Sequence, residues 1–150
     1  MEEHAKDCPD FTATVVQDEG TGVSLKRSMA KRRVENQELV KWGTQVVKHE
    51  GQIFFGRLMR EGNMFTLDVA MKASEEDCEA YLVEASMMDV QTGKLMFKSI
   101  FPPRPLVKEN NPGFCLVVPQ KAMAKVWKLN ENEEKYSFIH HIKINRNIRV

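Results

Sequence analysis

Apolar and polar residues alternate with a period of two along most of this chain, and long stretches with the 3.6-residue period of a helix are rare. Successive side chains of a β-strand point to opposite faces, so this alternation predicts strands with one buried face. Eight segments either alternate in this way or are short apolar runs between turn residues. They span residues 11–17, 38–47, 52–60, 64–72, 81–89, 95–101, 114–118 and 137–145.

Short glycine-containing turns join two pairs of these segments and predict two β-hairpins. Residues 61–63 connect the third segment with the fourth, and residues 90–93 connect the fifth with the sixth. Pro119 can start a short helix that extends to Lys128, because proline suits the first turn of a helix. Seven or eight strands at these spacings, with one or two short helices, predict an all-β fold that forms an antiparallel sandwich.

The length and composition fit one globular domain. A chain of 150 residues with 42% hydrophobic and 29% charged residues has the usual makeup of a folded domain. We assign this domain to residues 13–150 and treat residues 1–12 as a separate N-terminal segment. The formal net charge of +1 creates no overall field that would attract nucleic acid or an anionic membrane.

Cysteine use and the N-terminal sequence bear on the cellular compartment. Three widely separated cysteines argue against a disulfide framework and for a reducing compartment. The first ten residues are polar and acidic, unlike a signal peptide. No apolar run approaches the roughly 20 residues of a membrane span. We therefore expect a protein of the cytoplasm or the nucleus that has no membrane as a partner.

No sequence motif predicts catalysis, because the G-x-S-x-G, phosphate-loop, G-x-G-x-x-G and H-E-x-x-H patterns are all absent. We expect no enzyme activity, no cofactor and no small-molecule substrate. One alternative is a thiol–imidazole pair between Cys115 and either His140 or His141. Cys115 lies inside the apolar run FCLVV, however, where a buried core cysteine is the simpler interpretation. On a strand, one of the two adjacent histidines should face the core and the other the opposite side.

His4 and Cys8 have the spacing of the second half of a zinc knuckle, in which imidazole and thiolate complete a tetrahedral site. The two ligands that would precede them are absent, since only Met1, Glu2 and Glu3 lie upstream. We therefore expect no metal site in this chain. The segment over residues 1–12 can instead be the remnant of a zinc finger.

A basic run of five residues is the main charge cluster, formed by Lys26, Arg27, Lys31, Arg32 and Arg33. A solvated basic surface is the interpretation we favour. The alternative is a nuclear or nucleic-acid-associated regulatory domain that uses this run over residues 26–33. The near-zero net charge counts against nucleic acid as a partner.

Three stretches carry a resemblance to a known family. They are KHEGQIFFGRL over Lys48–Leu58, AYLVEASMMDVQTGKLMF over Ala80–Phe97, and GFCLVVPQKAMAKVW together with the later SFIHHIKIN. In order and spacing they resemble the C-terminal domain of the seven-in-absentia (Siah/Sina) ubiquitin ligases, which has a TRAF-like sandwich fold. The likeness covers about residues 38–145. The RING motifs that recruit a ubiquitin-conjugating enzyme are absent, so no ligase catalysis is implied.

The resemblance implies a substrate-recognition or adaptor domain that binds a partner protein or peptide and forms a homodimer. An extended peptide can add a strand to a sheet edge. The segment Val23 to Val34 diverges from the family but aligns loosely with its peptide groove, and we expect it to supply such an edge. The predicted partner-binding residues are apolar contacts and rim charges: Leu25, Met29, Val34, Arg32 and Arg33.

Overall fold

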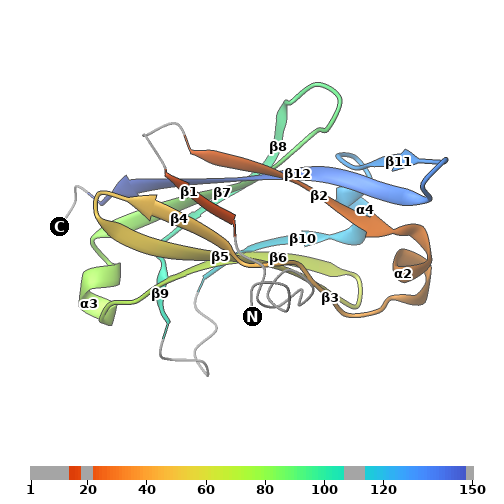
Figure 1. Cartoon of the computed structure of the whole chain (residues 1–150). Coiled ribbons are helices and arrows are strands. Elements are labelled where there is room, and N and C mark those ends of the chain that lie inside the picture. The colour runs from red at the N-terminus through yellow and green to blue at the C-terminus, as the bar shows by residue number, and fades with distance from the viewer. Residues whose placement is uncertain (1–13, 18–21, 107–113, 148–150) are drawn as a thin grey trace, which may run out of the picture.

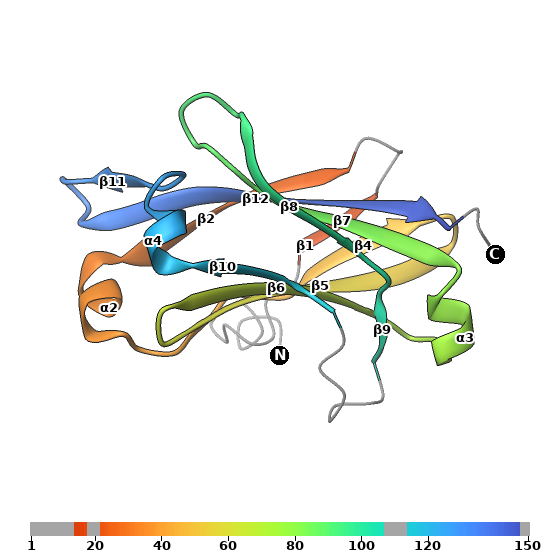
Figure 2. The same cartoon turned by 180° about the vertical axis from the view of Figure 1, so that it is seen from behind.

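Two β-sheets lie face to face and enclose the core (Figure 1, and from behind in Figure 2). This computed structural model describes residues 14–17, 22–106 and 114–147. The expected mostly β architecture, with two largely antiparallel sheets and short helices, is confirmed. The predicted N-terminal segment over residues 1–12 lies outside the described residues. Within the described ranges, no helix is long and apolar enough to cross a membrane.

The first sheet has seven strands in the order β1-β4-β5-β6-β10, with β3 paired to β5 and β9 paired to β6. The β1–β4 and β6–β9 pairs are parallel, and the other pairs are antiparallel. The strands are β1 (Thr14–Gln17), β3 (Val40–Lys41), β4 (Gln45–His49), β5 (Gln52–Glu61), β6 (Met64–Met71), β9 (Arg104–Pro105) and β10 (Leu116–Pro119).

The second sheet has five strands and is organised around its longest one, β12. This strand pairs with β2 on one side, and with β7 and β11 on the other. β8 pairs with β7, so β2 and β8 lie at opposite edges of this sheet. The strands are β2 (Val23–Ala30), β7 (Tyr81–Met88), β8 (Leu95–Phe101), β11 (Lys128–Asn130) and β12 (Lys135–Arg146).

Both predicted hairpins are confirmed. Strands β5 and β6 turn at Gly62, whose φ of 60° is in the left-handed region that favours glycine. Strands β7 and β8 form the second hairpin, with Gly93 at φ 71° in its turn. These hairpins depend on local turn chemistry and on alternation, which are the signals that a sequence shows most directly.

Two other predicted elements have the right type but the wrong extent. Residues 38–47 form two short strands instead of one, because the chain turns Trp42 inward against the core. The helix expected from Pro119 to Lys128 ends at Met123, because Val126 is 1% exposed in the core and β11 begins just after it. The helices are α2 (Lys31–Asn36), α3 (Glu75–Cys78) and α4 (Gln120–Met123).

An aromatic cluster joins the two layers. Phe65 of the first sheet lies 5.8 Å from Phe138 of the second, and the ring of Trp42 lies 5.5 Å from Phe138, measured between centroids. The sheets also pack closely at Gly56. A Cβ at Gly56 would lie 2.6 Å from Cδ1 of Ile142 on the facing strand β12. A larger residue at this point of β5 would therefore require the end of the Ile142 side chain to shift.

Candidate functional site

Strand β2 lies at an edge of the five-stranded sheet, and β12 is the one described strand that pairs with it. The backbone N–H of Lys31 donates to the carbonyl of Glu134 at 2.8 Å, which continues the β2–β12 register. In an antiparallel ladder, hydrogen-bonded and non-hydrogen-bonded pairs alternate. Odd-numbered residues of β2 therefore bond to β12, and even-numbered residues direct their backbone groups to the free side.

On the free side of β2, the backbone N–H and C=O groups of Ser24, Lys26 and Ser28 point away from β12. The carbonyl of Ser28 accepts a hydrogen bond from Nε1 of Trp42 at 2.9 Å, so the indole covers that end of the row. The side chains of the three residues are exposed on the outer face of the sheet. A row of backbone donors and acceptors of this kind can pair with an added strand.

The structure divides the five predicted partner-binding residues into three groups. Met29 and Val34 are 3% and 8% exposed and belong to the core. They offer no side-chain surface to a partner, which corrects that part of the prediction. Leu25 is half-buried on the inward face of β2, and partner binding by it stays a prediction. Arg32 and Arg33 are exposed, but they lie on α2, because β2 ends at Ala30 and does not extend through residue 34.

The basic run over residues 26–33 does not form one charged face. Arg27 turns inward, where its Nε donates to Nε2 of His140 at 3.0 Å and its Nη2 donates to the carbonyl of Gly43 at 2.9 Å. Burial lowers the pKa of the Arg27 guanidinium. The other four cations are exposed, one on β2 and three on α2. Because Arg27 points inward, it does not add to the positive charge of the surface. This weakens the nucleic-acid alternative, because phosphate binding needs clustered positive charge.

His140 is a buried, neutral histidine. It is 1% exposed, and burial lowers its pKa to about 3, with the charge of Arg27 acting in the same direction. Because Nε2 accepts from Arg27, the ring proton lies on Nδ1, which is buried without a partner among the described residues. His141 bonds to Oγ of Ser24 at 2.7 Å on the opposite face. The predicted alternation of the two histidines is therefore confirmed.

Arg60 places a buried guanidinium at the end of α2, and it is 0% exposed. Its Nη1 donates to the carbonyls of Arg33 and Glu38 at 2.7 and 3.1 Å. Its Nη2 donates to the carbonyl of Val34 at 2.9 Å and to Oε1 of Gln120 at 2.7 Å. The carbonyls of Arg33 and Val34 also accept the backbone N–H groups of Glu38 and Gln37, so the guanidinium is a second, charged donor to each. The guanidinium holds α2, with its exposed arginines, against the seven-stranded sheet.

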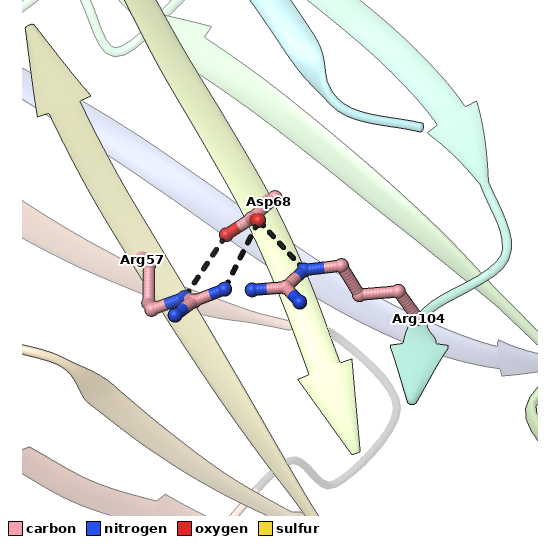
Figure 3. Close-up of polar contacts among 3 residues, drawn as sticks. All are labelled: Arg57, Asp68 and Arg104. Atoms are coloured by element: carbon pink, nitrogen blue, oxygen red, sulfur yellow. Dashed lines mark hydrogen bonds and ion pairs between the residues drawn. The ribbon is translucent and has the colours of Figure 1, made fainter. Parts of the chain in front are cut away.

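A second polar cluster lies on the outer face of the seven-stranded sheet (Figure 3). Oδ2 of Asp68 accepts from Nε of Arg104 at 2.9 Å, and the two carboxylate oxygens accept from Arg57 at 3.4 Å each. Burial raises the pKa of the Asp68 carboxyl, and the charge of Arg57 opposes that shift by lowering it. Sequence reasoning missed this cluster, because the parallel pairing of β9 with β6 brings Arg104 here and leaves no local pattern.

Cys115 lies beside this cluster and not in the core, which corrects the predicted core position. It is half-buried and lines the same hollow as Asp68. Burial raises the pKa of its thiol, and the charge of Asp68 acts in the same direction, so the thiolate is disfavoured. His140 lies between the sheets and His141 on the outer face of the other sheet. The geometry therefore gives no support to a thiol–imidazole pair.

No family model matches the chain, and no curated protein sequence matches it. Across the part of the chain that the structure describes, no three His, Cys, Asp or Glu side chains gather as metal ligands would. His4 and Cys8 lie outside that part.

Replacing Arg60 with Met should lower the free energy of unfolding by about 2–4 kcal/mol, because it removes the hydrogen bonds of a buried charged donor to three carbonyls and to Oε1 of Gln120. Urea unfolding monitored by tryptophan fluorescence measures the loss. Arg57→Met, three residues earlier on the outward face of β5, is the matched control and should change stability by less than about 1 kcal/mol. Equal effects of the two substitutions would contradict the role given to Arg60.

The free energy of unfolding should fall as the pH is lowered from about 6.5 to about 3. Unfolded His140 takes up a proton near pH 6.5, whereas the folded residue stays neutral down to about 3. The unfolded state thus binds more protons in this window, which costs the fold on the order of 3–5 kcal/mol.

Unfolding curves at several pH values test this expectation against two variants. His140→Gln retains an acceptor for Arg27 but cannot titrate, so its stability should depend less steeply on pH. His141→Gln is the control and should keep the slope of the original protein. If His140→Gln also keeps that slope, His140 is not the titrating group.

Proposed function

We propose that this domain is a protein-binding module, of the kind that serves as the substrate-recognition domain of seven-in-absentia ubiquitin ligases, with no ligase catalysis in this chain. The observation that carries the proposal is the free side of β2. The two-layer, largely antiparallel sandwich is compatible with a TRAF-like domain. The partner is a protein or peptide that presents an extended segment.

In this proposal, the partner segment pairs with the backbone of Ser24 and Lys26. The bound strand stops near Ser28, because Trp42 already occupies the carbonyl there. Main-chain hydrogen bonds provide the affinity, and the side chains that flank the edge provide selectivity. The exposed guanidiniums of α2 lie beyond this end of the strand and can attract an acidic flank of the partner.

A second copy of the chain is the partner that we propose for the opposite edge. Among the described strands β8 pairs with β7 alone, and it exposes Leu95, Met96 and Ile100 to 46%, 37% and 55%. An apolar edge strand invites association unless something covers it. Two copies can cover each other by the same self-complementary pairing, and the resemblance also implies a homodimer.

Lys26→Pro should abolish peptide binding at β2. Proline removes the N–H that faces the free side, while the hydrogen bonds of the neighbouring residues to β12 remain. Peptides selected from a random library on the original domain, then measured by fluorescence anisotropy, should bind Lys26→Pro at least about tenfold more weakly. Lys26→Ala is the control and should bind them within about twofold. Selected peptides that bind Lys26→Pro normally would place the site on another surface.

Ile100→Lys should shift the chain from dimer to monomer, because it puts a charge in place of the most exposed apolar side chain of this edge. Sedimentation equilibrium should show dimer dissociation at about tenfold higher concentration or more. Ile53→Lys, at a position 43% exposed on β5, is the matched control and should leave the association unchanged. A protein that sediments as a monomer before any substitution would refute the dimer.

A further inference from the structure

The outer face of the seven-stranded sheet carries a hollow of about 680 Å³ that the proposed peptide edge does not use. We propose that this hollow is a binding site for an oxyanion, a carboxylate or a phosphate group, attached to an apolar body. Figure 3 shows the cluster at its centre, in which Arg57 and Arg104 approach Asp68 from two different strands. The site lies on the other sheet from β2, so it is independent of the proposed function.

The two guanidiniums converge on one carboxylate oxygen. Oδ2 of Asp68 accepts from Nε of Arg104 and also from Nη2 of Arg57. Among the described residues, no second acidic side chain forms an ion pair with either arginine. Two like charges that meet at one anion are only partly compensated, and a second anion would relieve their repulsion. Guanidinium donors in a planar fork suit a carboxylate or a phosphate.

Of the two arginines, Arg104 is the more deeply buried. Its side chain is 9% exposed, and it is held there by the parallel pairing of β9 with β6. A charge removed from water is costly unless its hydrogen bonds are satisfied. The described contacts use Nε of this side chain, and its terminal nitrogens remain available to a ligand. Arg57 is 44% exposed, so the ligand can enter from its side.

The walls of the hollow indicate what the oxyanion is attached to. Met59 lines it beside the arginines and can cover an apolar group. Thr44 and Thr66 line it as well and can donate hydroxyl hydrogen bonds. A few polar groups that converge in a mainly apolar depression are typical of a ligand site.

The net charge of the side chains that line the hollow is compatible with either a carboxylate or a phosphate. Two guanidiniums and one carboxylate leave a net charge of +1 (2 − 1), which a carboxylate balances. Lys41 also lines the hollow and raises the total to +2, which suits a phosphate dianion. The two sources share one chemistry, and titration with simple ligands separates them.

The test is a titration of the isotope-labelled protein followed by NMR, with acetate, inorganic phosphate, phenylacetate and phenyl phosphate as probes. Sodium chloride at matched ionic strength is the reference. We expect saturable shifts of the Arg57 and Arg104 Nε–Hε signals and of the Thr66 amide. The phenyl probes should bind several-fold more tightly than acetate and phosphate. Preference for phosphate probes over carboxylates at equal concentration identifies the oxyanion.

Two variants distinguish a binding site from a structural ion pair. Arg57→Gln, at an exposed position, should weaken binding about tenfold. Asp68→Asn removes the competing carboxylate and should tighten binding by about fivefold or more, which a merely structural role would not produce. Lys128→Gln lowers the net charge equally on the other sheet and should have no effect.

Three results would overturn the inference: shifts that do not saturate, shifts that chloride reproduces, or affinities that Arg57→Gln and Asp68→Asn both leave unchanged. Because Arg57→Gln alters an exposed side chain, its effect stands even if Asp68→Asn fails to fold. Phenyl probes that bind no better than acetate and phosphate would refute the apolar body. A peptide that still binds the β2 edge in these variants leaves the proposed function intact.

Discussion

A buried guanidinium joins several elements at one end of this domain. Arg60 sits on the inward face of β5, where a charge is tolerated because carbonyl groups from the end of α2 surround it. α2 follows β2 directly, so fixing the helix also fixes where the edge strand ends. The same guanidinium holds Gln120 at the start of α4. One side chain thus connects β5 of the seven-stranded sheet with two helices, and through α2 with the end of β2.

The two candidate surfaces use the sandwich in different ways. The edge of β2 offers backbone groups whose direction the β2–β12 register determines, so its recognition is tolerant of partner sequence. The hollow offers side chains from four strands, β3, β5, β6 and β9, and its recognition depends on charge. Strand β5 contributes an arginine to each face of its sheet, because Arg60 faces the core and Arg57 faces the hollow. Alternation within one strand therefore separates a structural arginine from one that is open to ligands.

The sequence predicts the parts of this fold that local chemistry specifies. The two hairpins follow from alternation and from turns at Gly62 and Gly93. The burial of Met29 could also have been predicted, because Met29 shares the inward face of β2 with Val23. Strand β9 could not have been predicted, because its pairing with β6 is a long-range parallel contact that involves only two residues of each strand. The charged cluster could be predicted no better than the strand that brings Arg104 into place.

The pairing of β2 with β12 has a consequence for biosynthesis. Arg27 and His140, which bond across this pair, are 113 residues apart in the chain. While the ribosome is still working, the β5–β6 hairpin can form, but β2 has no sheet to join until β12 has been made. Contacts of such separation form late and slowly. Until then, both edges of β2 are unpaired in the nascent chain. Chaperones that bind extended apolar segments can bind β2 during this interval.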